Sequence, residues 1–160
     1  KKLIQAQKRH MHIGVPGHGI VIAVPIKSVG GGKTVAFLNG ETDNAAYTPS
    51  LNYAHELIVA ICSQGCTDMV MNAARAAGAR GGTVLHGKGT GAKGAPKFYN
   101  ITIAQEKEMI LIVAAASQKA AIMQSILKKA GPDSKAGTIV FSLPTTQVAG
   151  FALLDNQNET

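Results

Sequence analysis

The chain has 160 residues, of which 46% are hydrophobic and only 4% aromatic, and it carries a formal net charge of +7. This length accommodates one ordinary domain with an additional segment, and the aliphatic residues are numerous enough for a buried core. No run of about 18 apolar residues is present, so we expect no membrane span. The positive charge favours anionic partners in general, but the scarcity of aromatic rings argues against nucleic-acid binding by base stacking.

The cysteine and histidine residues do not predict a metal site. Cys62 and Cys66 are four positions apart and lack the two further ligands of a zinc site, so we interpret them as buried thiols. His10, His12 and His18 form a loose group without a neighbouring acid or cysteine, and we interpret them as surface residues. Free thiols and the lack of a recognisable signal peptide lead us to expect a cytoplasmic protein.

The first 40 residues predict the end of a helix, a turn and a strand. Residues 1–9 combine apolar positions with basic residues that favour a helix C-terminus, and residues 19–24 are a continuous apolar strand. The G-G-G-K-T sequence at 30–34 is not a phosphate loop, because Lys27 occupies a position that requires glycine. Residues 41–54 are polar and rich in turn formers, which is typical of a linker.

After the linker, apolar strands alternate with helical patterns. The predicted strands cover residues 56–63, 82–88, 109–115 (with Ile101 and Ile103 before it) and 138–143. Thr67 caps the first predicted helix, Gly78 ends it, and Ser117 caps the second. The residues predicted to pack these helices are Val70, Ala73, Ala74 and Ala77 in the first and Ala120, Met123 and Leu127 in the second. The order β-α-β-β-α-β predicts an α+β fold, a ferredoxin-like split βαβ sandwich with a four-stranded sheet and two helices on one face.

Residues 1–31 repeat part of this pattern. An offset of 119 residues places Pro25 on Pro144 and Val21 on Val140. The N-terminal segment is therefore interpreted as the end of an earlier copy of the same domain, of which only a part is present. The predicted organisation is a partial first copy at 1–40, a linker at 41–54, a complete domain at 55–152 and a tail at 153–160.

The most distinctive segment is rich in glycine and basic residues. Glycine occupies every second position at Gly87, Gly89 and Gly91, and the lysines at 88, 93 and 97 make the segment positive. Backbone amides without a neighbouring Cβ, combined with positive charge, suit a phosphate or another anion. A flexible surface loop with solubilising lysines is an equally acceptable interpretation of these residues alone.

Four segments together resemble the PII nitrogen-regulatory family, and in particular its PII-like branch with tandem copies. They read H-E-L-I-V-A-I-C at 55–62, G-A-R-G-G-T-V-L-H-G-K-G-T-G at 78–91, K-E-M-I-L-I-V at 107–113 and G-T-I-V-F-S-L at 137–143. The resemblance implies a ferredoxin-like trimer with a flexible loop after the second strand and nucleotide bound between subunits. It also implies a regulator of transporters, enzymes or transcription factors that is not itself a catalyst.

Two segments depart from the pattern of this family. The loop at 91–100 is short, with Ala92 and Lys93 where the signalling members carry arginine and glutamine. The phosphate-binding turn of the family reads T-G-x-x-G-D-G-K, whereas residues 130–138 read A-G-P-D-S-K-A-G-T, with Thr138 in place of the lysine. The C-terminal arginine pair of the family is also absent after Phe151. These departures argue against uridylylation and against nucleotide binding in the usual manner.

The function predicted from these features is that of a PII-like regulatory protein that senses a small anion, such as ATP, ADP or AMP, at clefts between the subunits of a homotrimer. No resident cofactor, metal ion, catalytic residue or nucleic-acid partner is expected, and the regulated protein is not identified. The alternative is a trimeric scaffold of the same fold that binds no ligand. The predicted ligand-binding residues are Lys88, Gly89, Thr90, Gly91, Lys93, Ser134, Lys135, Gly137 and Thr138.

Overall fold

The computed structural model describes residues 2–13, 15, 18–25, 52–89, 97–98, 101–102 and 104–150. The chain forms two compact units, Tyr53–Leu143 on the one hand and Lys1–Asn52 together with Pro144–Thr160 on the other. Within the described ranges, no helix is long and apolar enough to cross a membrane.

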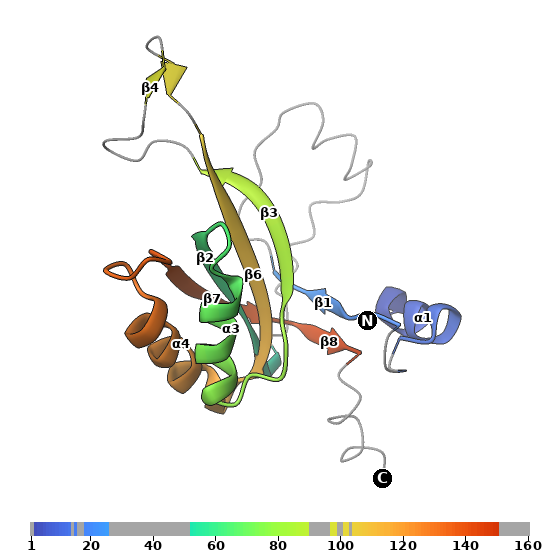
Figure 1. The fold of residues 1–160 in the computed structure, drawn as a ribbon. Coiled ribbons are helices and arrows are strands. Elements are labelled where there is room, and N and C mark those ends of the chain that lie inside the picture. The colour runs from blue at the N-terminus through green and yellow to red at the C-terminus, as the bar shows by residue number, and fades with distance from the viewer. Residues whose placement is uncertain are drawn as a thin grey trace. The chain divides into compact units, whose positions relative to one another are not determined.

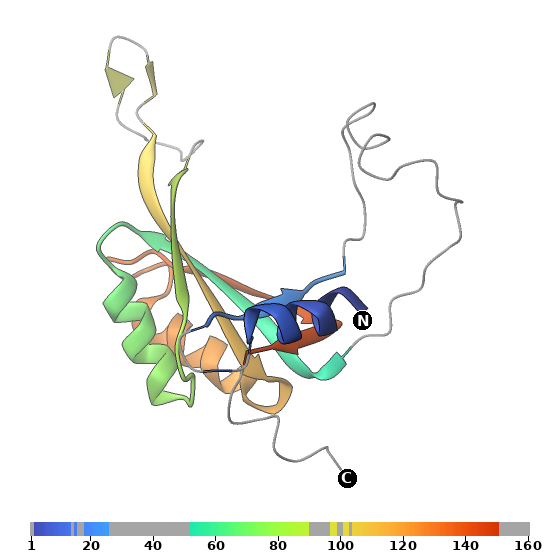
Figure 2. The same ribbon diagram turned by 90° about the vertical axis from the view of Figure 1, so that its right-hand side faces the viewer.

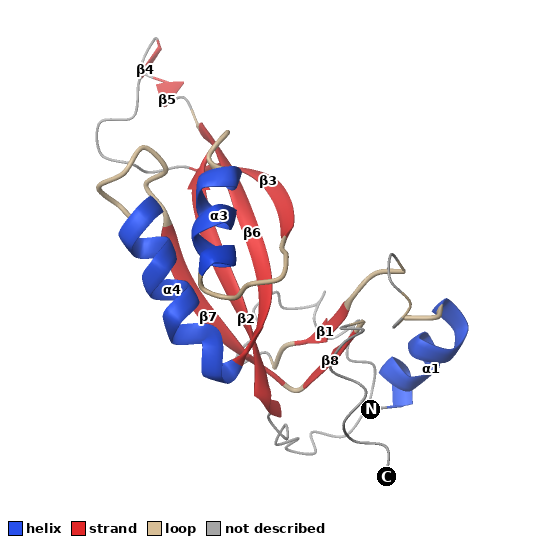
Figure 3. Cartoon of the chain, turned by 60° about the horizontal axis from the view of Figure 1, so that its bottom comes forward, coloured by secondary structure: helices blue, strands red, loops and turns tan. Residues whose placement is uncertain are grey.

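The Tyr53–Leu143 unit is a two-layer α+β sandwich (Figure 1). Its sheet has the strand order β3-β6-β2-β7, and these strands cover Thr83–Gly89, Gln105–Ala115, Asn52–Ser63 and Ile139–Thr145 respectively. Helices α3 (Thr67–Ala76) and α4 (Ala116–Ala130) lie on one face of the sheet, as Figures 2 and 3 show from two further directions. The predicted β-α-β-β-α-β order and ferredoxin-like fold are confirmed.

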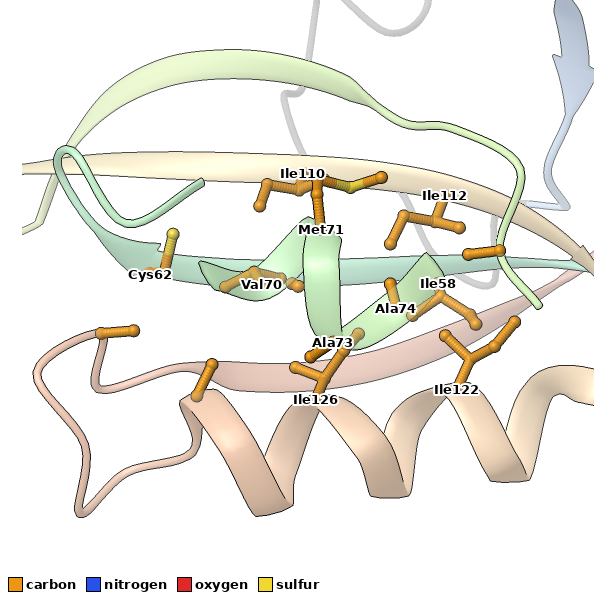
Figure 4. Packing of buried hydrophobic residues seen from close by; sticks show 14 of the residues in the cluster. Ile58, Cys62, Val70, Met71, Ala73, Ala74, Ile110, Ile112, Ile122 and Ile126 are labelled. Atoms are coloured by element: carbon orange, nitrogen blue, oxygen red, sulfur yellow. The ribbon is translucent and has the colours of Figure 1, made fainter. Parts of the chain in front are cut away.

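An aliphatic core fills the space between the sheet and the helices. The central strands β2 and β6 pair antiparallel, with Ile58 opposite Ile112 and Ala60 opposite Ile110, and all four side chains are fully buried. Figure 4 shows buried side chains of these strands packing against those of α3 and α4. The helical side chains labelled there are Val70, Met71, Ala73, Ala74, Ile122 and Ile126. Because side chains alternate along a strand, the residues between these positions lie on the face that neither α3 nor α4 covers.

Both ends of α3 are fixed by hydrogen bonds, but not all of them are those that the sequence predicts. At the C-terminus, Gly78 has a φ of 101°, its N–H donates to the Arg75 carbonyl, and the Ala79 N–H donates to the Ala74 carbonyl. This pair of bonds is a Schellman motif, so the predicted helix end at Gly78 is confirmed. The predicted cap at Thr67 is wrong: the helix begins at Thr67, and its hydroxyl donates to the Glu108 carboxylate instead of accepting a hydrogen bond from a backbone N–H of the first turn.

The buried side of α4 differs from the prediction. Ile122, Ile126 and Ala130 are fully buried, whereas Leu127 is 45% exposed and Ala120 is exposed. No side-chain cap forms at the N-terminus of this helix, so the predicted cap at Ser117 is also wrong. The helix is rich in alanine and carries apolar residues on several sides, so periodicity alone does not select the side that contacts the sheet.

Two strand boundaries also differ from the prediction. β6 begins at Gln105, and Ile101–Thr102 forms a separate strand, β5, that pairs antiparallel with β4 (Lys97–Phe98). The last strand, predicted at 138–143, extends to Thr145, so Pro144 lies inside β7. β7 is an outer strand of the sheet, where a residue without an N–H donor is tolerated.

The second unit contains α1 (Lys2–Met11), β1 (Val21–Ala23) and β8 (Gln147–Ala149). The helix and strand predicted for the N-terminal segment are therefore present, although the strand is shorter than predicted. β1 and β8 pair antiparallel over three residue pairs, and both the amide and the hydroxyl of Thr146 donate to the Ala23 carbonyl. Whether this segment is part of an earlier copy of the domain stays a prediction, as do the predicted domain boundaries.

Candidate functional site

The described residues of the predicted ligand site lie in two segments. Lys88 and Gly89 end strand β3, and Ser134, Lys135, Gly137 and Thr138 belong to the turn at residues 131–138, which connects α4 to β7. The other three predicted site residues lie outside the described residues, together with most of the loop at 91–100. They are Thr90, Gly91 and Lys93.

These two segments lie at the same end of the sheet but at opposite edges. Lys107 of β6 is opposite both Gly87 of β3 and Ser63 of β2, and the Ser63 N–H donates to the Ala136 carbonyl in the turn at 131–138 (2.9 Å). Because β6 and β2 separate the two outer strands, three strand spacings of about 4.8 Å, or roughly 14 Å, lie between the segments. A single subunit therefore does not bring them into contact.

The turn at 131–138 uses most of its polar groups internally. The Ser134 hydroxyl donates to the Gly131 carbonyl (2.8 Å) and accepts from the Ala136 N–H (3.2 Å). The Gly137 N–H donates to the Ser134 carbonyl (3.1 Å), and the φ of 55° at this residue favours glycine. The hydroxyl of Ser134 therefore already forms its hydrogen bonds within the turn.

Thr138 and Lys135 have opposite environments within this turn. Thr138 is fully buried, its N–H donates to the Ala130 carbonyl, and its hydroxyl has no hydrogen-bond partner among the described residues. Lys135 is exposed, and its carbonyl accepts a weak hydrogen bond from the Cys66 thiol (4.0 Å). Of the residues in the turn, Lys135 thus offers the side chain that is best placed to contact a ligand from solvent.

The end of β3 carries a neutralised lysine. The Lys88 ammonium lies 3.5 Å from the Glu106 carboxylate, directly across the β3–β6 ladder, and both side chains are largely exposed. Such exposed pairs contribute little to stability. The ion pair nevertheless reduces the positive charge that Lys88 would offer to an anion.

Lys107 is not among the predicted site residues, although it lies in β6 between the C-terminal ends of β3 and β2. Its side chain is half-buried on the face opposite the helices, and its ammonium donates to the Ser63 hydroxyl (3.2 Å). A sequence signal was present: Lys107 is in the same alternating series as Met109 and Leu111, so it shares their face of the sheet. The sequence does not show which strand pairs with it, and this pairing is what places Lys107 beside the glycines of β3.

Glu108, one of the few acids of the chain, has a structural role. Its carboxylate is 6% exposed and accepts hydrogen bonds from the Gly65 N–H (3.0 Å), the Thr67 N–H (3.1 Å) and the Thr67 hydroxyl (2.6 Å). The Thr67 hydroxyl, followed by the Gly65 amide, lowers the pKa of Glu108. The charged carboxylate therefore caps the N-terminus of α3 from a neighbouring strand.

In the described part of the chain, the remaining reactive side chains do not lie together as a catalytic set. Burial raises the pKa of Cys62 to about 11, so its thiol stays protonated at neutral pH, and Cys66 is also buried. The rings of His12 and His18 meet edge to face with centroids 6.4 Å apart. The described residues include no group of three or more acids, histidines or cysteines that could hold a metal ion.

Residues 55–151 match the family model of the nitrogen regulatory protein P-II. The chain belongs to the PII family. PII proteins are regulatory signalling proteins and typically assemble as trimers, so the chain is a PII-like regulatory protein. Among solved structures, the chain matches the crystal structure of Arabidopsis thaliana PII bound to citrate with 21% sequence identity and a TM-score of 0.45, over 57% of this chain and 77% of that chain. No curated protein matches the chain.

Proposed function

We propose that this PII-like protein is a cytoplasmic homotrimer that senses a small anion, such as an adenine nucleotide, between its subunits and thereby regulates a partner protein, in nitrogen metabolism or a related process. One observation carries the proposal. Two segments with glycine and lysine residues lie at the same end of the sheet but at opposite edges, where only a neighbouring subunit can complete a shared site.

The face of the sheet opposite the helices supports trimer formation. Its side chains include an apolar row across paired strands, formed by Leu85, Met109 and Ile61, and Leu85 is 47% exposed. Leu57 and Val59 on the same face are already buried within the chain. The outermost strand adds Ile139 and Phe141, which are 63% and 41% exposed. A sheet with apolar residues on both faces needs cover on both, and α3 and α4 cover only one.

The proposed site places the anion between the backbone at 89–91 and the turn at 131–138 of a neighbouring subunit. The turn contributes chiefly through Lys135, because the Ser134 hydroxyl is used internally and the Thr138 side chain is buried. Lys93 supplies a second cation in this proposal. A charge-assisted hydrogen bond of this kind is worth about 1.5–3 kcal/mol when it is well desolvated.

A trimeric scaffold that binds no ligand is the second candidate. It is favoured by the buried Thr138, because the family pattern has an ionised lysine at this position of the phosphate-binding turn. In this alternative the apolar face still drives assembly, while the turn at 131–138 only connects α4 to β7.

Isothermal titration with ATP, ADP, AMP and citrate distinguishes the two candidates. The sensor predicts saturable binding of at least one of these anions, and a loss of about 10- to 150-fold in affinity for Lys135→Ala. Arg80→Ala is the matched control, since Arg80 is an exposed cation that precedes β3 at the opposite end of the sheet. Absence of binding to every anion, in a protein that is still trimeric, would establish the scaffold instead.

A further inference from the structure

We propose that the second unit carries a surface that binds the anionic headgroups of a lipid bilayer without crossing it. The surface lies at the end of α1 and in the turn that follows (Figure 3), and we call it the basic apolar surface. It is separate in the chain from the proposed anion site, so the two proposals are independent. Its residues are Lys8, Arg9, His10, Met11, Val15 and Ile20.

The positive charge of the chain is concentrated in residues 1–40. Six of the 16 lysine and arginine residues lie there, and none of the nine acidic residues does. This quarter of the sequence therefore carries +6 of the formal net charge of +7, whereas residues 41–160 are almost neutral. Such asymmetry is typical of a segment that contacts an anionic surface. In the described part of this segment, Lys8, Arg9 and His10 all lie in the last turn of α1.

Large apolar side chains are exposed directly beside these cations. Met11 is 59% exposed, and Val15 and Ile20 are exposed as well. Hydrogen bonds order the turn that carries Val15, because its N–H donates to the His12 carbonyl (3.2 Å) and its carbonyl accepts from the His18 N–H (3.1 Å). Exposed apolar groups that are bordered by polar residues mark interaction surfaces.

The helix places its cations on both sides of an apolar stripe. At about 100° per residue, Met11 lies within about 20° of Ile4 around the helix axis, and Lys8 and His10 flank Met11 at about 60° and 100°. A helix that lies in a bilayer interface buries its apolar stripe and keeps the flanking cations at the headgroups. The last turn of α1 has this arrangement.

An anionic bilayer suits this surface better than nucleic acid does. Nucleic acid offers phosphates, but it offers no apolar region for Met11, Val15 and Ile20, and the chain has few aromatic rings for base stacking. A bilayer provides both, since its headgroups attract the cations and its acyl chains accept the aliphatic side chains. With ten residues, α1 is long enough to lie on a bilayer but not to span it.

The test is co-sedimentation of the full chain with vesicles of phosphatidylcholine alone and with vesicles that also contain phosphatidylglycerol. We expect reversible binding to the mixed vesicles only, and weaker binding at high salt, because salt screens the cations. The double variant Lys8→Gln with Arg9→Gln should bind about 5- to 25-fold more weakly. Met11→Gln should lose about 5- to 10-fold, since it keeps the charge but removes an apolar group.

The core unit offers a matched control for each variant. Lys128→Gln with Lys129→Gln removes two adjacent exposed cations from the last turn of α4, and Leu127→Gln removes an apolar side chain that is exposed there. Both controls should bind the mixed vesicles as wild type does. Melting curves should show the same transition in all four variants, because the substituted side chains lie outside the core.

Three results would overturn the proposal and leave the proposed anion sensor intact. One is wild-type protein that binds neither kind of vesicle, or both kinds equally. Another is wild-type binding in Met11→Gln while the charge variant loses binding to the vesicles and to double-stranded DNA alike, which would indicate attraction to any polyanion. The third is self-association that Met11→Gln abolishes, without vesicle binding, which would assign the basic apolar surface to a second copy of the chain.

Discussion

The two compact units differ in how many independent interactions hold them together. The Tyr53–Leu143 unit has a four-stranded sheet, a single core cluster that includes residues of both helices, and a helix that is closed at both ends. The β1–β8 ribbon in the other unit has three residue pairs and depends on a close backbone contact between Gly19 and Gly150. Two-stranded ribbons are marginal by themselves. We therefore expect the core unit to tolerate loss of the ribbon, whereas a core defect should unfold the sheet.

The largest effect is expected for truncation in the core. Ile110→Ala removes a fully buried side chain from the central strand β6 and should lower the free energy of unfolding by about 2–5 kcal/mol in a urea titration. Ile139→Ala is the matched control, because that side chain is 63% exposed and its loss should cost far less when the protein is monomeric. Equal costs for the two substitutions would contradict the core described above.

A smaller effect is expected at the buried carboxylate that caps α3. Glu108→Gln removes the charge that accepts three hydrogen bonds, and should lower the free energy of unfolding by about 1–3 kcal/mol at pH 7. The pKa of Glu108 is lowered from 4.5 in the folded protein, so its stabilisation is complete above that value and is lost as the pH falls through the folded-state pKa.

The advantage of wild type over Glu108→Gln should therefore shrink on acidification below about pH 4.5. Urea titrations at pH 7, 5 and 3.5 measure this difference. A constant difference across that range would show that the ionised carboxylate is not what holds the N-terminus of α3.

The ribbon can be disrupted without touching the core. Gly150 has a φ of 99°, and an added Cβ would overlap the Gly19 carbonyl oxygen, so Gly150→Ala should cost about 1–2 kcal/mol locally. Hydrogen exchange should accelerate at the amides of β1, while those of β6 keep their protection. Gly81→Ala is the control, since its φ is ordinary and its Cβ would meet no atom within 4 Å. Accelerated exchange in both strands would show that the two units unfold together.

The smallest effect is expected at the exposed ion pair of β3. Lys88→Ala removes one partner of the pair with Glu106 and should change the free energy of unfolding by no more than about 1 kcal/mol. The same urea titration measures it. A loss comparable to that of Glu108→Gln would mean that this end of the sheet depends on Lys88 far more than its exposure indicates.

Features that depend on local sequence patterns could be predicted from the sequence, whereas those that depend on contacts between distant segments could not. The succession of strands and helices along the chain and the end of α3 at Gly78 follow from local patterns, namely continuous apolar runs and a glycine after a helix. The pairing of β1 with β8 and the position of Lys107 beside Gly89 depend on contacts between distant segments, which local patterns do not specify. The burial of Thr138 is of the same kind, because it follows from how the turn at 131–138 packs.

Native mass spectrometry of the wild-type protein with ATP tests the central claim most directly, because it reports the number of chains and of bound ligands in one spectrum. Phosphate and citrate should be measured in parallel, since the site is proposed for an oxyanion. The account predicts a trimer that carries up to one anion for each subunit junction and that binds the anion more weakly in Lys135→Ala. A monomer, or a trimer that binds none of the three anions, would contradict it.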